Sequence, residues 1–450
     1  MATKTNSVDM INGSLWGKIL RFSTLFMLTT FMQHLYSAAD VMVVGRFAGQ
    51  TALAGVGTCT VVVNLFLNFI IGLSAGATIV LGQAMGANDR EGIGKAVHTS
   101  ISVAICGGFI VSVICILFSR QLLNMIDVPK NVMPEASAYL RVIAVGFIPS
   151  LIYNFGAAIL RAKGDTKRPL YIVSASGIIN VILNLFFVCV LKMKASGVAT
   201  ATVASQVFTA VVILYILCHE ADETKISLKK LRIHKKPFLK ILKFGLPSGI
   251  QSSVYSASNI LVQSSVNSFG SAATAGAAAA ASITDFYNAM VNSLYQASIV
   301  FTSQNYGARK FDRIKKTIFV CMTYVVCLWA IQSVITFFFG KFLLELYVPN
   351  DTAALEMGWR KFGLLGYTYG LLGLMNVMSG ALRGMGASFF NMIMSIVGVC
   401  GIRVLWILTA FKAIGTFESL YVCYPLSWGG TLILHSIMFL FIFRKAKYHQ

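Results

Sequence analysis

The sequence predicts an all-α polytopic membrane protein with twelve transmembrane helices in two six-helix bundles. The 450 residues have a mean hydropathy of +0.74, with 56% apolar and only 12% charged side chains, which excludes an ordinary soluble globular chain. Apolar runs long enough to cross about 30 Å of hydrocarbon recur from end to end. In addition, the second half of the chain repeats features of the first.

Each apolar run is predicted as a helix, because a backbone in lipid must satisfy its own hydrogen bonds. The expected spans are 19–43, 52–82, 96–118, 138–160, 169–191, 197–218, 241–267, 274–302, 318–340, 362–382, 389–411 and 421–443. The polar segment before the first span is not followed by a short apolar core with a small-residue cleavage site. We therefore expect it to be retained rather than removed as a signal peptide.

The distribution of basic residues indicates the orientation in the membrane. Twelve crossings place both termini on one side. If that side is the cytoplasm, 26 of the 37 Lys and Arg lie on the inner side, 10 on the outer, and Arg403 lies within a span, as the positive-inside rule requires. The net charge of +21 is thereby explained without nucleic acid. We expect a monomer in the cell inner (plasma) membrane, with both termini cytoplasmic.

A basic segment, 219–240, joins the sixth span to the seventh and divides an N-terminal bundle (1–218) from a C-terminal bundle (241–450). Such a Lys-rich linker either is a solvated cytoplasmic loop or holds anionic lipid headgroups. The solvated loop is the simpler interpretation.

Three matches across this linker indicate a duplicated six-helix unit. ILRFSTL at 19–25 returns as ILKFGLP at 241–247, and LRAKG at 160–164 returns as LRGMG at 382–386. GQAMGA after the second span likewise corresponds to SQNYGA after the eighth. Because each copy has an even number of spans, both enter the membrane from the same side. The expected symmetry is a pseudo-two-fold axis along the membrane normal.

Asp40 is the most informative polar residue, because it lies near the end of an otherwise apolar span. Gln33, Tyr36, Ser37 and Asp40 share one helical face. A charge deep in a bilayer costs about 2.5–3.5 kcal/mol and normally marks an ion or substrate path. We predict that Asp40 exchanges a proton or a cation within a cavity. The alternative is an interfacial acid hydrogen-bonded to a neighbouring helix end.

Two further polar stripes lie in the first half and favour a cavity there over simple helix-to-helix bonding. On the fifth span the stripe consists of Ser176, Asn180 and Asn184. On the sixth span it consists of Thr202, Ser205, Gln206 and Thr209.

The second half carries one acidic stripe on its second span, comprising Asp285, Asn288, Asn292 and Gln296. The repeat partner of Asp285 is Asn64, so this acid is not shared by the two copies. Asp285 either lines a cleft or pairs with a neighbouring helix. Arg403 is a possible counter-charge to either acid.

Motifs for catalysis and metal binding are absent from the sequence. The nine Cys form no CxxC pair, and there is no GK[ST] phosphate loop, HExxH motif or convincing Ser–His or Cys–His pairing. We therefore expect a protein that is not an enzyme and needs no cofactor or metal site. Its energy source is expected to be an ion gradient.

Several segments together resemble the multidrug and toxic compound extrusion (MATE) family, in its bacterial DinF-like branch, over about residues 18–443. They are Asp40, GQAMGA at 82–87, LRAKGDTKRP at 160–169, Asn180 and GVATATVASQ at 197–206. The resemblance implies two bundles, V-shaped about a cleft, that export organic cations or amphiphilic drugs in exchange for H⁺ or Na⁺. It also implies a first-bundle cavity formed by Asp40, Tyr36, Asn154, Asn180, Asn184 and Thr202.

Two departures from the family pattern affect the expected mechanism. Leu25 replaces a proline that usually allows the first span to bend, and Asn184 replaces a frequent second acid. With one carboxylate instead of two, a proton shared through Asp40 is a simpler coupling ion than Na⁺.

These considerations predict a secondary active efflux transporter that works by alternating access. The expected coupling residues are Asp40, Asn180, Asn184 and Thr202. The expected substrate cavity contains Gln33, Tyr36, Asn154, Ser176, Gln206 and Asp285. The alternative is a flippase for a lipid-linked precursor, whose cleft should offer cationic side chains to phosphates.

Overall fold

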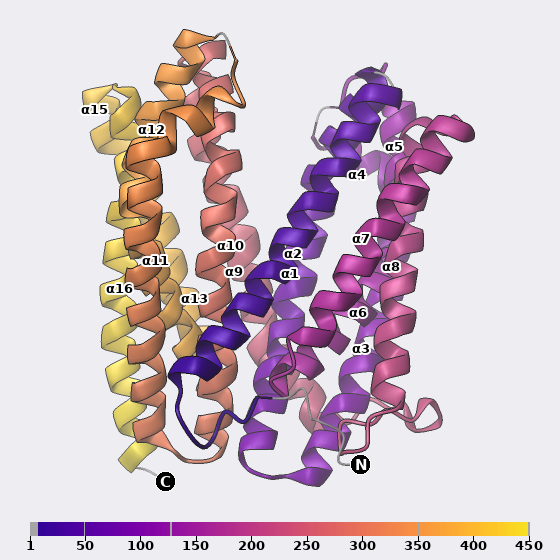
Figure 1. The fold of residues 1–450 in the computed structure, drawn as a ribbon, viewed down its shortest axis with the longest axis vertical. Helices are drawn as coiled ribbons and strands as arrows, with labels where there is room; N and C mark the ends of the chain where they lie inside the picture. Colours follow the sequence, from indigo (N-terminus) through magenta and orange to yellow (C-terminus); the bar gives the residue numbers. More distant parts are fainter. Residues whose placement is uncertain (1–7, 49, 127, 350, 449–450) are drawn as a thin grey trace. The chain divides into compact units, whose positions relative to one another are not determined.

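The computed structural model describes residues 8–48, 50–126, 128–349 and 351–448, which fold into two compact units built of helices (Figure 1). Unit 1 comprises Leu28–Gly249 together with Val8. Unit 2 comprises Asp9–Met27 and the described residues from Ile250 onward. Two helices contribute to both units, α1 (Trp16–Val43) and α9 (Lys235–Asn267).

The remaining helices divide between the units along the sequence. Unit 1 contains η1 (Val44–Ala48), α2 (Gln50–Gly86), α3 (Arg90–Leu117), α4 (Ser119–Asn124), α5 (Met133–Val145), α6 (Phe147–Ala162), α7 (Lys167–Leu185), η2 (Phe186–Val190), α8 (Lys194–Cys218) and η3 (Leu228–Lys230). Unit 2 contains α10 (Ser271–Gly307), α11 (Phe311–Glu345), α12 (Thr352–Gly384), α13 (Ser388–Ser395), η4 (Ile396–Gly401), α14 (Ile402–Trp406), η5 (Ile407–Phe411), α15 (Lys412–Ile414) and α16 (Phe417–Tyr448).

The predicted all-helical class is confirmed, and each of the twelve predicted spans lies within a helix or a run of helices. Three spans are less regular than expected. The fifth ends in the π-helical turn η2. The fourth is the pair α5 and α6, bent by 43° at Gly146. The eleventh runs from α13 to α15 and is interrupted by the π-helical turns η4 and η5. Hydropathy periodicity does not reveal these irregularities, because all three segments stay predominantly apolar.

Among the described residues, seven helices are long and apolar enough to cross a membrane, or eight when the bent α5–α6 pair is taken as one span. The other four predicted spans correspond to α1, α9, α10 and α12, whose sequences contain more polar residues. Polar side chains within a spanning helix face protein or water rather than lipid. These four helices are therefore the ones whose polar faces need partners.

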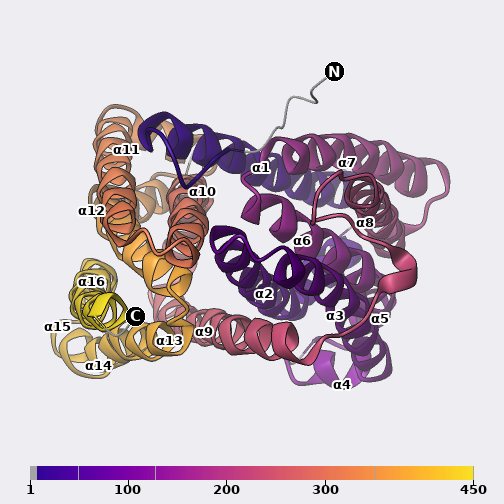
Figure 2. The same cartoon turned by 90° about the horizontal axis from the view of Figure 1, so that it is seen from below.

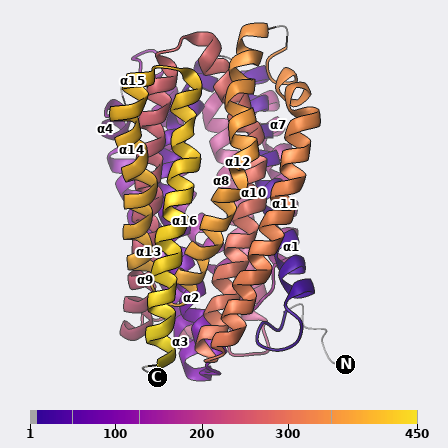
Figure 3. The same ribbon diagram turned by 90° about the vertical axis from the view of Figure 1, so that its left-hand side faces the viewer.

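Within unit 1, α6 lies against α2, α3 and α8, and α7 packs along α8 (Figure 2). Within unit 2, α12 packs along α10 and α16, and α16 runs beside the segment formed by α13 and α14 (Figure 3). The core of unit 2 is rich in aromatic rings. Tyr369 contacts Trp428 edge-on, and Tyr421 stacks on Tyr424.

Glycine contacts explain why the start of α9 belongs to unit 1. A Cβ atom on Gly72 of α2 would lie 2.5 Å from the Gly249 nitrogen, and one on Gly76 would lie 2.5 Å from the Ile241 oxygen. The two backbones therefore meet directly, as small residues permit between membrane helices. The first helix of the second sequence repeat, α9, therefore starts in direct contact with α2.

The start of α1 belongs to unit 2 for a corresponding reason. The ring of Phe22 meets Phe301 of α10 edge-on, with centroids 5.8 Å apart. Just before α1, the Arg313 guanidinium of α11 donates to the carbonyls of Met10, Asn12 and Gly13 at 2.8–3.1 Å. The compact units thus do not coincide with the sequence halves 1–218 and 241–450.

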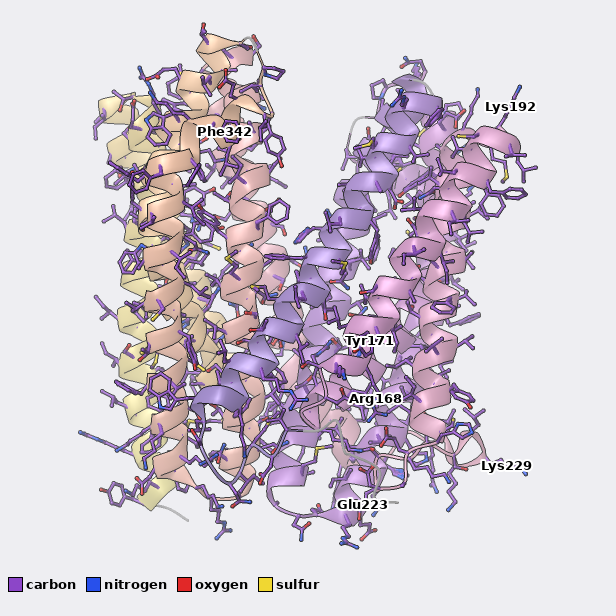
Figure 4. All side chains as sticks on the ribbon, viewed as in Figure 1. Arg168, Tyr171, Lys192, Glu223, Lys229 and Phe342 are labelled. Atoms are coloured by element: carbon purple, nitrogen blue, oxygen red, sulfur yellow. The ribbon has the colours of Figure 1, made fainter. Side chains whose placement is uncertain are left out.

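The first part of the linker is held on unit 1 by its acidic residues. Glu220 is buried and pairs with Lys163 at 2.5 Å and with Arg168. Asp222 also pairs with Lys163, and Glu223 pairs with Arg90 at 3.1 Å. Figure 4 shows Arg168 and Glu223 at the same end of unit 1, opposite Lys192. The first residues of the linker are therefore bound to unit 1 by ion pairs and do not form a fully solvated loop.

We predict that Gly72→Ala destabilises the protein by about 1–3 kcal/mol, because the added methyl group overpacks the contact between α2 and α9. The measurement is the thermal unfolding midpoint in detergent. Gly57→Ala, on the same helix, is the matched control, because a Cβ atom added at Gly57 would have no neighbouring atom within 4 Å. An equal midpoint for the two variants would contradict the backbone contact.

The docked linker predicts a pH dependence of stability. Partial burial alone would raise the pKa of the Asp222 carboxyl, but hydrogen bonds from Lys163 and Thr224 hold that pKa below its ordinary value. The carboxylate therefore contributes stability above pH of about 4, where it is ionised in the unfolded chain, and this contribution is lost as the pH falls. We expect Asp222→Asn to lower the unfolding midpoint at pH 7.

The difference from the wild type should shrink as the pH falls below the ordinary carboxyl pKa of about 4 and the wild-type carboxyl also becomes protonated. Asp312→Asn, which neutralises an exposed acid at the start of α11, serves as the control. A gap between wild type and Asp222→Asn that does not narrow with acidification would refute this account.

Candidate ion-coupling site in unit 1

The site is built where the polar faces of α7 and α8 meet. Asp165, which is fully buried, accepts the backbone N–H groups of Lys167 and Arg168 at 3.0 and 3.1 Å and so fixes the start of α7. After η2, a tight turn through Lys192, at φ +54°, returns the chain into α8. The two helices become close neighbours, so their stripes face each other.

Hydrogen bonds join these stripes along their length. The Ser176 hydroxyl donates to the Ser205 carbonyl at 3.1 Å, and the Asn180 amide lies 3.5 Å from the Ser205 hydroxyl oxygen. The Asn184 amide donates to the Asn180 side-chain oxygen at 3.1 Å. A continuous row of polar groups therefore runs up the buried face of α7.

Asp40 of α1 completes this row. Its Oδ1 accepts a hydrogen bond from the Asn184 amide, and its Oδ2 lies 3.5 Å from the Thr202 hydroxyl. That hydroxyl is closer, at 3.0 Å, to the Val198 carbonyl of its own helix. Asn184 is therefore the principal donor to the carboxylate.

The carboxylate has neutral hydrogen-bonding partners and no basic one. In the part of the chain that the structure describes, no Lys, Arg or His forms an ion pair with Asp40. The residue is half-buried, so one side of it stays accessible. A charge held this way is free to gain and lose a proton or a cation without first breaking an internal salt bridge.

The Asn184 side chain has unused hydrogen-bonding capacity. Its Nδ2 donates to both Asp40 and Asn180, whereas its buried Oδ1 has no partner among the residues that the structure describes. An amide is both donor and acceptor, so a 180° turn of this group would offer an acceptor to a protonated carboxyl. Both charge states of Asp40 can thus be satisfied by one neighbour.

Two π-helical turns adjoin the site, and hydropathy periodicity does not predict them. The turn η1 begins four residues after Asp40, and η2 begins two residues after Asn184. Single π turns inside helices occur often at functional sites, because they leave local backbone groups less constrained. The helices that carry Asp40 and Asn184, α1 and α7, therefore each pass from α-helical to π-helical geometry just after that residue.

The structure brings together the four predicted coupling residues and two predicted cavity residues, Ser176 and Tyr36, whereas the others lie apart from them. Tyr36 lies one turn before Asp40 and packs against Gly177 of α7. Asn154 donates to the Ser150 carbonyl of its own helix at 2.8 Å. Gln206 points at Gly146, where α5 and α6 bend, and Gln33 is half-buried on α1.

The predicted acid of the second half, Asp285, is exposed on α10 in unit 2, whereas Asp40 lies in unit 1. Asp285 acts electrostatically on Lys361 and Tyr369. Arg403 donates to Ser427 at 3.2 Å and to Asn259 at 2.9 Å, and its guanidinium lies 4.2 Å from the Tyr424 ring centroid.

The sequence analysis missed Lys361, because it falls one residue before the predicted tenth span. In the structure it lies nine residues inside α12, with its ammonium group 2.9 Å from the Ala277 carbonyl and 5.4 Å from the Tyr421 ring centroid. The longer helix, rather than any motif, brings this cation into unit 2.

A multi-span helical protein with a carboxylate held by neutral donors inside its membrane segments belongs, as a class, with the membrane transporters. The family model for MatE matches residues 26–186 and 247–408, which is most of both sequence halves. The chain belongs to this family, the multidrug and toxic compound extrusion transporters, as its sequence resemblance indicated.

Individual relatives agree with this assignment. A Bacillus subtilis protein described as the probable multidrug resistance protein YoeA is 26% identical over 443 residues, covering 96% of this chain and 95% of its own. A transporter of the MOP superfamily from Pyrococcus furiosus, described as having a binding pocket of reverse polarity, matches with a TM-score of 0.92 at 20% identity. The match covers 99% of each chain.

An outward-facing multidrug resistance MATE family transporter also matches, with a TM-score of 0.90 and 20% identity over 99% of each chain. At these identities, the two structural matches establish the fold alone.

The hydrogen bonds predict unequal roles for the two donors to Asp40. We expect Asn184→Leu to increase carbodiimide labelling of Asp40 several-fold, because loss of the principal donor to the carboxylate favours the protonated, reactive carboxyl. Thr202→Val should have a smaller effect, since the Thr202 hydroxyl bonds mainly to Val198. Labelling is measured by mass spectrometry of Asp40 peptides. Equal labelling of the two variants would be inconsistent with this hierarchy.

Proposed function

We propose that the protein is a secondary active multidrug efflux transporter that exchanges organic cations for protons, with Asp40 as the coupling carboxylate. The observation that carries this proposal is a carboxylate within the membrane that has amide and hydroxyl partners but no ion pair among the described residues. The multidrug names of its relatives support the substrate class. The proposed location is the cell inner membrane, with both termini cytoplasmic.

Competition for one carboxylate would couple the two fluxes. A cation and a proton cannot both neutralise Asp40, so binding of either one weakens binding of the other. When a proton arrives, the Asn184 amide can turn its oxygen to the protonated carboxyl. When the proton leaves, the same amide again donates to the carboxylate. The Asn184 amide therefore has a hydrogen-bonding group for either charge state of Asp40, although in the turned state its Nδ2 no longer donates to Asn180.

The local donor set favours H⁺ over Na⁺ in this proposal. A hard cation prefers several oxygen ligands, often more than one carboxylate. Among the described residues of the site, Asp40 supplies the one carboxylate, and Asn184 on α7 contributes a neutral amide in place of a second acid. A proton needs only one acceptor, so this geometry suits it better.

Asp40→Asn tests the proposal directly. The variant should insert and fold, because an amide can bond with Asn184 and Thr202, but it should lose pH-gradient-driven efflux of a cationic dye from proteoliposomes by about 10²-fold or more. Thr209→Val, on the same stripe of α8, controls for loss of a buried hydroxyl. Coupled efflux by Asp40→Asn at the wild-type rate would remove this residue from the mechanism.

Imposing pH and Na⁺ gradients separately on the same liposomes distinguishes the coupling ions. Efflux driven by the Na⁺ gradient alone would replace H⁺ with Na⁺ in the proposal.

A flippase for a lipid-linked precursor remains a second candidate, favoured by the cations of unit 2. Arg403 and Lys361 are held by neutral groups and aromatic rings, an arrangement that suits an anionic headgroup. Preferential binding of a pyrophosphate lipid over cationic dyes, lost in Arg403→Gln, would favour this function over drug efflux.

A further inference from the structure

An apolar groove runs between α1 and α7 of unit 1, with a volume of about 330 Å³. Its walls include Met32, Leu35 and Ala39 from α1 and Ile178, Val181 and Ile182 from α7. The groove lies beside the ion-coupling site, and the polar residues Ser176, Asn180 and Asn184 are not among its lining residues. The exchange mechanism proposed above does not involve this groove.

Gly177 allows the floor of the groove to form. A Cβ atom at this position would lie 3.1 Å from Cδ1 of the Tyr36 ring, closer than ordinary van der Waals contact. Without a side chain there, the Tyr36 ring rests on the α7 backbone. The groove is therefore shaped by a specific glycine–tyrosine contact.

The open side of the groove has the character of a surface that faces lipid. Leu35, Ile178 and Ile182 are 54%, 64% and 60% exposed. The exposed side chains of α7 are all apolar or aromatic: Tyr171 (Figure 4), Ile178, Ile182 and Leu185. Within a membrane-spanning helix, such a face lies against acyl chains, whereas the buried Ser176, Asn180 and Asn184 face the interior.

The groove leads to the coupling carboxylate. Tyr36, which forms its floor, precedes Asp40 by one helical turn, or about 6 Å along the axis. Ala39, in its wall, directly precedes Asp40 in sequence. A linear molecule lying in the groove would thus have one end close to a negative charge that has no basic partner among the described residues.

We propose that this groove binds the apolar chain of an amphiphilic cation that enters from the bilayer, while Asp40 holds its positively charged headgroup. This inference rests on the proposed efflux function and specifies its substrate class. Charge complementarity selects the occupant, because an anionic or neutral lipid would gain nothing from the carboxylate. Burial of the chain supplies affinity, and the charge determines which amphiphiles are exchanged.

The first test compares two cations with the same headgroup. The concentrations of dodecyltrimethylammonium and tetramethylammonium that halve efflux of a compact cationic dye are measured in wild type, Ile178→Trp and Val211→Trp. Ile178→Trp places a large ring in the groove from an exposed position. Val211→Trp is the matched control on α8, where the side chain is 60% exposed outside the groove.

In Ile178→Trp, the ratio of the dodecyl value to the tetramethyl value should rise about tenfold, since a chain that loses several buried methylene groups loses an order of magnitude in affinity. Val211→Trp should keep the wild-type ratio. A wild-type ratio in Ile178→Trp, or an equal rise in both variants, would overturn the groove as the binding site. Absence of dye efflux in the wild type would instead refute the efflux function.

The second test does not depend on transport. A dodecyltrimethylammonium analogue with a diazirine at the end of its chain should label α1 and α7 within 32–39 and 173–182. Asp40→Asn should reduce this labelling several-fold, while labelling by the uncharged dodecanol analogue stays weak in both proteins. Strong labelling of the groove by both probes, unaffected by Asp40→Asn, would show ordinary lipid occupancy and contradict the proposal.

Discussion

A carboxylate placed within a membrane must be stabilised by the protein that surrounds it, and the organisation of unit 1 follows from this requirement. Asp40 cannot be solvated by lipid, so α7 and α8 bring an amide and a hydroxyl to it. These donors are available only because the two helices are joined by a short turn and bonded along their polar faces. The same row of hydrogen bonds that holds the helices together therefore also sets the chemistry of the acid.

The two sequence repeats have kept their packing features and diverged at their charged residues. Gly72 and Gly76 of α2 meet the start of α9, and Phe22 at the start of α1 correspondingly meets α10. In contrast, the cluster formed by Asp165 and Arg168 has no counterpart in the second repeat, where Ala387 and Phe390 occupy the equivalent positions. Duplication thus supplied a framework of helix contacts, whereas function made the two copies chemically different.

The sequence predicted the helical class and all twelve spans, because hydropathy reports directly on membrane crossing. It also grouped Asp40 with Asn180, Asn184 and Thr202, since helical spacing together with the family resemblance placed them around one cavity. It could not reveal the bend at Gly146, the π turns beside Asp40 and Asn184, or the groove floored by Tyr36. Those features depend on contacts between helices, which periodicity within one helix does not encode. Gln206 shows the limit clearly, because it shares a stripe with Thr202 yet points at Gly146.

The exchange of entry helices between the units has a consequence for biosynthesis. Gly72 and Gly76 of α2 pack directly against the start of α9, which the ribosome delivers after the linker. A chain severed in the linker would expose that backbone to lipid in one fragment, and the other fragment would lack the segment that packs on α10. Each repeat therefore completes the packing of its own entry region only when the other repeat has been synthesised.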